Sequence, residues 1–171
     1  MKVIETERLL LRWAREEDAP FILELLNDPS WIRYIGDREI RTIEQATNYI
    51  SSVLINMYER VGFGLYLVER KEDKTPLGIC GLIKRDSLED TDLGFAFSSK
   101  FQRRGYGFEA SSATLAYGRD HLGLTKIVAI TSEKNTNSSK LLEKIGMKYD
   151  RMVLLPQDNK ELKLFKIEFD L

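Results

Sequence analysis

The sequence predicts one mixed α/β domain, with a central twisted sheet of about seven strands flanked by about four helices. Its 171 residues are enough for one hydrophobic core and few for two domains of ordinary size. Some segments carry apolar residues three or four positions apart, whereas others are short apolar runs typical of strands. No repeat, low-complexity tract or Pro/Gly-rich linker interrupts the chain, so we treat residues 1–171 as a single domain.

The N-terminal half is predicted to hold a strand, two helices and a hairpin. Residues 6–13 form a short apolar run before charged residues, as an opening strand does. Residues 18–26 carry an acidic N-cap and one apolar stripe, which predicts a helix. Residues 42–62 begin with a capping box and keep apolar residues at helical spacing up to a glycine. Residues 63–68 and 77–83 flank a polar turn, which predicts a β-hairpin.

The C-terminal half is predicted to alternate strands with helices, so that the whole order is β-α-α-β-β-β-α-β-α-β-β. Helical spacing followed by a glycine marks residues 107–122 and 138–145. The apolar runs that predict strands are residues 93–97, 126–131, 147–155 and 160–169. In the last of these runs the apolar phase slips between Leu164 and Phe165, which predicts a bulge or a shifted register there.

Composition excludes several classes of protein. Lys and Arg number 26 and Asp and Glu 27, so the net charge of −1 lacks the basic excess that nonspecific nucleic-acid binding needs. No apolar run approaches the roughly 20 residues of a membrane helix, and the first residues lack the pattern of a secretory signal. With Cys80 and His121 as its single cysteine and histidine, the chain offers neither a disulfide nor a zinc cluster. We therefore expect a cytoplasmic protein that binds no nucleic acid, no membrane and no metal.

A phosphate-binding loop is predicted between the strand at 93–97 and the helix that begins near residue 107. Glycine lets the backbone turn tightly and approach a ligand, and the first N–H groups of a helix are unpaired donors at the positive end of its dipole. Two arginines add fixed positive charge, although a solvated turn without a ligand is the alternative interpretation. The residues of this loop are Gln102, Arg103, Arg104, Gly105, Tyr106 and Gly107.

Residues 105–110 also satisfy the G-x-G-x-x-A fingerprint of a dinucleotide-binding turn. In that fold the first glycine follows its strand almost directly, whereas seven residues separate Phe97 from Gly105 here. The residues before the loop do not form a βαβ repeat either. A dinucleotide-dependent oxidoreductase therefore stays only as an alternative from another functional class.

The loop resembles motif A, Q/R-x-x-G-x-G/A, of the GNAT N-acetyltransferases. Further segments resemble the subfamily of ribosomal-protein N-terminal acetyltransferases (RimJ/RimL-like), in the family's order and spacing. These segments are T-E-R-L-L-L-R at residues 6–12, N-D-P at 27–29 with R-Y-I-G at 33–36, and N-x-x-S-x-x-L-x-x-K-x-G-M at 135–147. The resemblance covers nearly the whole chain, and it is more specific for the fold and the acetyl-CoA site than for the acceptor.

The resemblance implies a GNAT fold with acetyl-CoA as cosubstrate, bound where the strands at 93–97 and 126–131 splay apart. The pyrophosphate would lie on the N–H groups of residues 103–107. The pantetheine amides would pair with backbone groups of Phe95, Ala96 and Phe97, and one of these N–H groups would stabilise the oxyanion. Asn135 would lie near the cofactor arm, with helix capping as its alternative role.

The catalytic residues are less well marked. Many relatives carry a tyrosine acid where Leu142 stands, so Ser138 is the nearest replacement that could protonate the departing thiolate, with helix capping as its alternative role. Asp92 stands where relatives often place an acidic residue and is the candidate general base, with a solvated turn charge as the alternative. Trp31 and Tyr34 would line the acceptor pocket or pack in the core.

The activity that the resemblance implies is direct transfer of the acetyl group to a primary amine in a ternary complex, by a monomer or a homodimer. The acceptor stays open between a protein N-terminus, an amino acid, a polyamine and an aminoglycoside-like drug. At pH 7 about one α-amine in ten is neutral, against about one lysine amine in 2,500, so a site without a strong base would suit an α-amine. A GNAT module that binds acetyl-CoA without turnover is the alternative.

Overall fold

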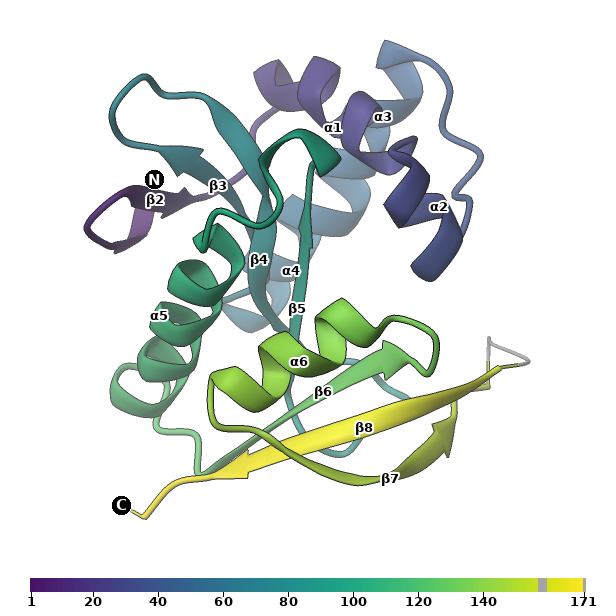
Figure 1. The fold of residues 1–171 in the computed structure, drawn as a ribbon. Coiled ribbons are helices and arrows are strands. Elements are labelled where there is room, and N and C mark those ends of the chain that lie inside the picture. The colour runs from purple at the N-terminus through teal and green to yellow at the C-terminus, as the bar shows by residue number, and fades with distance from the viewer. Residues whose placement is uncertain (157–159, 171) are drawn as a thin grey trace.

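In the part of the chain that the structure describes, eight strands form one sheet in the order β1-β2-β3-β4-β5-β6-β8-β7 (Figure 1). The computed structural model describes residues 1–156 and 160–170. The strands are β1 (Lys2–Glu5), β2 (Leu9–Arg12), β3 (Leu65–Arg70), β4 (Pro76–Ile83), β5 (Asp92–Phe97), β6 (Lys126–Ser132), β7 (Lys148–Leu154) and β8 (Glu161–Glu168). The helices are α1 (Ala19–Leu26), α2 (Pro29–Tyr34), α3 (Ile43–Tyr49), α4 (Asn56–Val61), α5 (Tyr106–Asp120) and α6 (Thr136–Lys144), with short 3₁₀ turns at Glu16–Asp18 and Ser99–Phe101.

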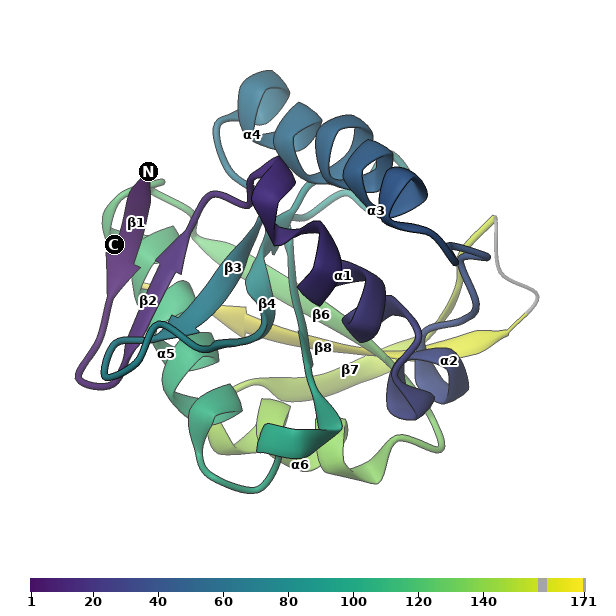
Figure 2. The ribbon, with the colours of Figure 1, turned by 90° about the horizontal axis from the view of Figure 1, so that it is seen from above.

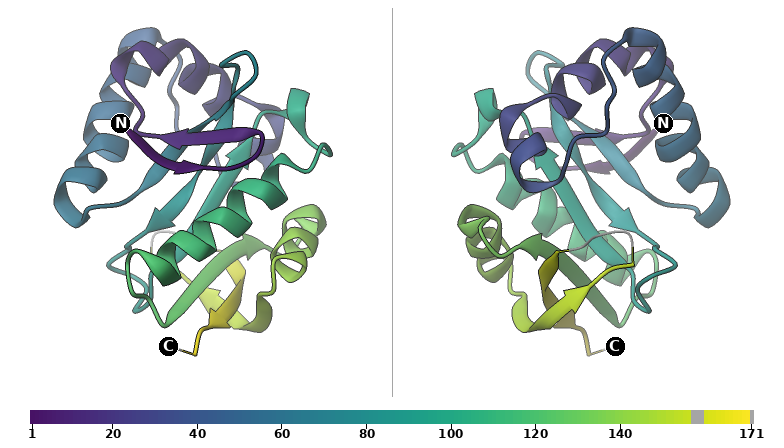
Figure 3. Two further views of the ribbon diagram at one scale, coloured as in Figure 1. Left: turned by 90° about the vertical axis from the view of Figure 1, so that its left-hand side faces the viewer. Right: turned by 90° about the vertical axis from the view of Figure 1, so that its right-hand side faces the viewer.

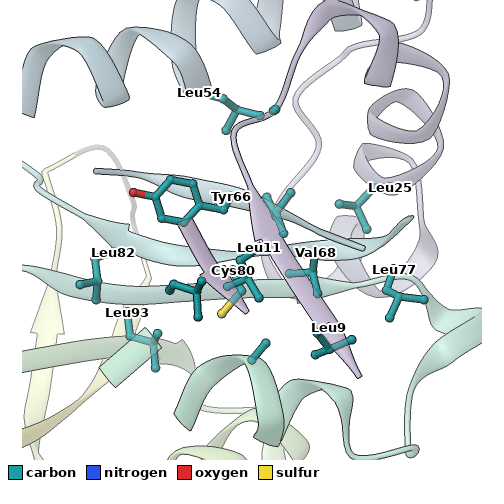
Figure 4. Close-up of a cluster of buried hydrophobic side chains, with 14 of the residues drawn as sticks. Leu9, Leu11, Leu25, Leu54, Tyr66, Val68, Leu77, Cys80, Leu82 and Leu93 are labelled. Atoms are coloured by element: carbon teal, nitrogen blue, oxygen red, sulfur yellow. The ribbon is translucent and has the colours of Figure 1, made fainter. Parts of the chain in front are cut away.

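Helices cover both faces of the sheet. Figure 2 shows α1, α3 and α4 on one face and α5 and α6 on the other, and the side views agree (Figure 3). The central strand β4 is buried along Leu77 to Leu82, as expected of a strand that is covered on both sides. Part of this core is drawn in Figure 4, where side chains of β2, β3 and β4 pack together: Leu9, Leu11, Val68, Leu77 and Cys80. Across residues 1–156 and 160–170, no helix combines the length and the apolarity that crossing a membrane would take.

The sheet opens between β5 and β6. All other neighbouring strands of the described sheet are antiparallel, whereas β5 and β6 are parallel. Among the described residues these two strands pair at Asp92 and Val128 alone and then diverge (Figure 1). A sheet with a single parallel pair is not the doubly wound parallel sheet of dinucleotide enzymes, so the oxidoreductase alternative does not fit this fold.

The predicted strands and helices are present, and the structure adds two short elements, β1 at the edge of the sheet and α2 after α1. The helix predicted at 42–62 begins with the expected capping box, in which Thr42 accepts a hydrogen bond from the backbone of Gln45. A π-helical segment, Ile50–Ile55, divides it into α3 and α4. Gly62, with a φ of +86°, ends α4.

A bulge lies beside the predicted phase slip, but in the neighbouring strand. Tyr149 pairs with Phe165 and Arg151 with Leu164, so Asp150 of β7 is the extra residue. β8 itself keeps a regular register with β6. The prediction was therefore right about the position of the irregularity along the sheet, opposite Leu164 and Phe165, and wrong about the strand that contains the extra residue.

Candidate active site

A cavity of about 380 Å³ lies against β5, walled by α2, by the segment that leads into α5, and by α6. It gathers every predicted site residue except Arg104 and Asp92. The predicted residues in its wall are Trp31, Tyr34, Phe95, Ala96, Phe97, Gln102, Arg103, Gly105, Tyr106, Gly107, Asn135 and Ser138. Residues predicted for the acetyl donor and for the acceptor therefore share one cavity.

The backbone of β5 faces two different neighbours in alternation. The N–H of Val128 in β6 donates to the carbonyl of Thr91 at 3.0 Å, so Thr91 faces β6. The N–H of Ser98 donates to the carbonyl of Leu77 in β4 at 2.9 Å, so Ser98 faces β4. Successive residues of a strand direct their backbone groups to opposite sides. The backbone groups of the odd-numbered residues of β5 therefore face the gap beside β6.

Phe95 and Phe97 thus present edge groups to the gap, and Ala96 does not. Ala96 pairs with Ile79 of β4, so the alternation directs its backbone groups to β4, which argues against the prediction that they pair with the pantetheine. Ala96 still lines the cavity wall. Nε2 of Gln102 donates to the carbonyl of Phe97 at 3.0 Å, which joins the end of β5 to the loop before α5. The free edge of β5 is the kind of surface to which an extended amide-bearing ligand can add like a strand.

The loop before α5 has a left-handed backbone at two positions. Gly105, the N-cap of α5, has a φ of +82°, and Arg103 has a φ of +66°. Glycine alone adopts this conformation without strain, so Gly105 allows the tight entry into the helix. The N–H groups of residues 103–108 have no acceptor among the described residues, and those at the start of α5 lie at the positive end of its dipole. Together with the Arg103 side chain, this arrangement can hold a pyrophosphate.

Arg104 lies outside the cavity wall. Its side chain is exposed, with the guanidinium 6.0 Å from the centre of the Phe101 ring. Its carbonyl accepts a hydrogen bond from Nη1 of Arg8 at 3.1 Å. Arg104 therefore contributes its backbone N–H to the loop, and the structure does not bring its side chain to the cavity.

The start of α6 forms another part of the wall. Asn135 is the N-cap of this helix, and its Oδ1 accepts a hydrogen bond from the N–H of Ser138 at 3.2 Å. The capping role is thus present in Asn135 rather than in Ser138, and both side chains also line the cavity. The hydroxyl of Ser138 makes no hydrogen bond to the described residues, so it can serve a ligand. Leu142, at the position of the relatives' tyrosine, is buried in the core.

Asp92 is buried at the start of β5 and is not part of the cavity wall. Its Oδ2 accepts a hydrogen bond from Nε of Arg85 at 3.1 Å, and its Oδ1 has no partner among the described residues. Burial raises the pKa of Asp92, and the charge of Arg85 opposes this shift. The alternative that Asp92 is a solvated turn charge is wrong, because the side chain is buried. Its predicted role as general base gains no support from the structure, since Asp92 lies outside the cavity wall.

Asp28 holds α2 over the cavity. Its carboxylate caps α2 by accepting from the N–H and hydroxyl of Ser30, and it also accepts from the N–H and hydroxyl of Ser99, beyond β5. Burial alone would raise the pKa of Asp28, but the hydrogen bonds from Ser99 and Ser30 outweigh it and hold the pKa below its ordinary value. This clamp fixes the helix that carries Trp31 and Tyr34.

Several residues of the wall were not predicted. Asp28 could be read from the N-D-P segment as a helix cap, but its contact with Ser99 joins positions 71 residues apart. Lys140 and Lys144 lie one helical turn apart on α6, a spacing that marks one face of a helix. In the part of the chain that the structure describes, no three His, Cys, Asp or Glu side chains gather as a metal site.

Known proteins resemble this chain in sequence and in structure. The family model described as an acetyltransferase (GNAT) domain matches residues 8–148. An uncharacterized N-acetyltransferase of Bacillus subtilis, YoaA, is 29% identical over 145 residues, covering 84% of this chain and 81% of its own. The crystal structure of a GNAT-family acetyltransferase from Bacillus anthracis is similar with a TM-score of 0.81 at 26% identity, over 98% of each chain. RimL, a ribosomal L7/L12 alpha-N-protein acetyltransferase solved with coenzyme A, has a TM-score of 0.83 at 14% identity, over 99% of each chain.

The matched residues include the whole loop at 102–107, all of β5 and all of α6, so the cavity lies within the family domain. GNAT acetyltransferases take their acetyl group from acetyl-CoA. The unpaired N–H groups before α5 and the free edge of β5 fit the two polar parts of that cosubstrate, its pyrophosphate and its pantetheine amides. The chain belongs to the GNAT family of acetyl-CoA-dependent acetyltransferases.

Proposed function

We propose that this protein transfers the acetyl group of acetyl-CoA directly to the α-amine of a peptide or of a small molecule. The observation that carries this proposal is the single cavity in which the phosphate loop, the free edge of β5 and the aromatic residues of α2 meet. Such an arrangement lets donor and acceptor bind together, so that positioning supplies much of the rate acceleration.

The donor side is assigned to backbone groups. Acetyl-CoA, when bound, supplies the activated thioester carbonyl. The N–H groups of residues 103–107 and the charge of Arg103 bind the pyrophosphate, while Phe95 and Phe97 bind the pantetheine amides. An N–H group of the same edge polarises the thioester carbonyl, a contribution of about 3–4 kcal/mol in other enzymes.

Direct transfer is favoured over an acyl-enzyme. Cys80 does not line the cavity, and burial raises the pKa of its thiol to about 11, against weaker opposing hydrogen bonds from Thr114 and Ser111. A thiol with such a pKa is not a nucleophile near neutral pH. Among the described residues of the wall there is no histidine that could activate Ser138 as a nucleophile. We assign Ser138 instead as the general acid that donates a proton to the departing thiolate.

The charges of the wall favour an acceptor of low positive charge. Its described residues include three cations, Arg103, Lys140 and Lys144, and one carboxylate, that of Asp28. Both oxygens of Asp28 already accept hydrogen bonds, so they are poor partners for a polycation such as a polyamine. An α-amine also needs less help from a base, since about one in ten is neutral at pH 7. The similar RimL structure is that of an alpha-N-protein acetyltransferase, which agrees with this choice.

An acceptor panel tests the proposal. The protein is incubated with acetyl-CoA and, separately, with short peptides that have free or blocked N-termini, with Nα-acetyl-lysine, and with a polyamine, while release of the CoA thiol is followed. We expect release that depends on a free α-amine and forms an Nα-acetyl product by mass spectrometry. Preference for the polyamine would contradict the acceptor class. Tight binding of acetyl-CoA without release by any amine would favour the non-catalytic module.

A further inference from the structure

We propose that Arg8 is a positioning residue for the phosphate loop, an inference that rests on the proposed function. Arg8 lies in the turn between β1 and β2, and this turn lies next to the start of α5 (Figure 3, left). The residue is absent from the cavity wall. It therefore acts on the loop from behind, through Arg104, Gly105, Tyr106 and Glu109.

Arg8 fixes the backbone of the loop at its most constrained point. Nη1 of Arg8 donates to the carbonyl of Arg104 at 3.1 Å. This carbonyl lies between Arg103 and Gly105, the two residues with positive φ. A Cβ atom on Gly105 would lie 3.3 Å from Nη2 of Arg8, so the guanidinium also packs against the glycine. A non-glycine residue such as Arg103 keeps a left-handed conformation only when its surroundings hold it there, and Arg8 supplies part of that support.

Arg8 also neutralises a carboxylate beside the anion site. Glu109, in the first turn of α5, accepts hydrogen bonds from Nε of Arg8 at 2.7 Å, from the N–H of Arg8 at 2.9 Å and from Thr6 at 2.5 Å. A carboxylate near a helix N-terminus is attracted by the same dipole that would attract a pyrophosphate, and it would repel that pyrophosphate. The ion pair with Arg8 compensates the charge of this carboxylate, so Glu109 repels a bound pyrophosphate less.

Tyr106 completes the support from the side of the sheet. The guanidinium carbon of Arg8 lies 4.4 Å from the centre of the buried Tyr106 ring, a cation–π contact. The hydroxyl of Tyr106 accepts a hydrogen bond from Nη1 of Arg70 at 3.3 Å. The first residue of α5 thus contacts two arginines, Arg8 from the turn between β1 and β2 and Arg70 from β3, and Arg8 is the one that also contacts the loop.

The test compares two ligands that differ in the pyrophosphate. Acetyl-CoA carries it, and S-acetylpantetheine lacks it together with the adenosine. In Arg8→Gln we expect the Kd for acetyl-CoA, measured by calorimetry, to rise at least about tenfold, because hydrogen bonds to charged groups are lost. The Kd for S-acetylpantetheine, from an NMR titration of the protein, should change by less than about twofold, since the edge of β5 is untouched.

Variants separate the charge from the geometry. Arg8→Lys keeps the charge but loses the planar fork, and should weaken acetyl-CoA binding less than Arg8→Gln does. Adding Glu109→Gln to Arg8→Gln should recover part of the loss, because the uncompensated carboxylate is removed as well. Lys71→Ala is the matched control, since it removes a cation that pairs with Glu5 in the same hairpin without touching residues 102–105.

Two results would overturn the inference. Unchanged acetyl-CoA affinity in Arg8→Gln would show that the loop keeps its geometry without Arg8. Equal weakening of the binding of both ligands would mean that Arg8 has a general structural role. Failure of the wild-type protein to bind either ligand would instead contradict the proposed function, and this inference would fall with it.

Discussion

At the scale of single residues, the chemistry depends on which polar groups remain available to a ligand. The N–H of Ser138 donates to Asn135, whereas its hydroxyl has no partner among the described residues, and Ser138 lines the cavity. Asp28, by contrast, is saturated by Ser30 and Ser99 and holds structure rather than substrate. Hydrogen-bond accounting of this kind separates groups that hold the fold from groups that can act on a ligand.

Replacing Ser138 tests its role as the acid. In Ser138→Ala we expect kcat with the best α-amine acceptor to fall by about ten- to hundredfold, because the thiolate leaves without a proton donor. The Kd for acetyl-CoA should stay within about twofold, since no cofactor contact is assigned to the hydroxyl. Ser138→Thr keeps a hydroxyl and serves as the control. Equal kcat in the alanine variant and the wild type would remove Ser138 from the mechanism.

At the scale of elements, β5 organises the site because it changes partners along its length. It pairs with β4 over its whole length, but within the described part of the chain it pairs with β6 only at Asp92. The remaining edge can pair with a ligand, and the loop that follows leads directly into the N-terminus of α5. In the proposed site, one strand therefore aligns the edge for the pantetheine with the loop for the pyrophosphate. Gln102 joins that edge to the loop by its hydrogen bond to the carbonyl of Phe97.

The start of β5 contains a buried charge whose effect on stability depends on pH. Burial raises the pKa of Asp92 in the folded state above its ordinary value of 3.8. The folded state therefore binds the proton more tightly than the unfolded state, so this residue's contribution to stability is full below pH 3.8 and is lost as pH rises through the folded pKa. In Asp92→Asn this loss is absent. The free energy of unfolding of the variant should therefore rise relative to that of the wild type between acid and neutral pH.

Urea midpoints at acid, intermediate and neutral pH measure this difference between Asp92→Asn and the wild type. Asp86→Asn, at an exposed position before the same strand, is the control and should follow the wild type. If the wild type instead becomes more stable relative to Asp92→Asn as pH rises, the ion pair with Arg85 outweighs the cost of burial.

At the scale of the whole molecule, local patterns predicted most elements but not how they meet. The capping box at Thr42 and the glycines after the helices were readable because these signals act within one turn. β1 was missed because a four-residue strand with charged ends has no clear alternation, and the six-residue α2 is too short for a periodic pattern. The motif and the family resemblance predicted twelve residues of the cavity wall, but not others such as Asp28, Lys140 and Lys144.

Contacts between distant segments could not be predicted in the same way. The divergence of β5 from β6 was expected from the family resemblance and not from any local pattern, and the burial of Asp92 beside it was not predicted. The hydrogen bond of Arg8 to Glu109 joins positions 101 residues apart, and that of Ser99 to Asp28 joins positions 71 apart. A single sequence shows which residues can form such hydrogen bonds but not which residue each one pairs with. Strand register and helix placement are set by packing of the whole sheet.

The most direct measurement is a thermal melt of the purified protein alone, with acetyl-CoA, and with NADH at the same concentration. A ligand at about 100 times its Kd adds roughly 2.7 kcal/mol to the free energy of unfolding, which for a chain of this size raises Tm by about 5–11 °C. The cavity described here predicts this rise with acetyl-CoA and none with NADH. No rise with acetyl-CoA at saturating concentration, or a rise with NADH alone, would contradict the assignment of the cavity as an acetyl-CoA site.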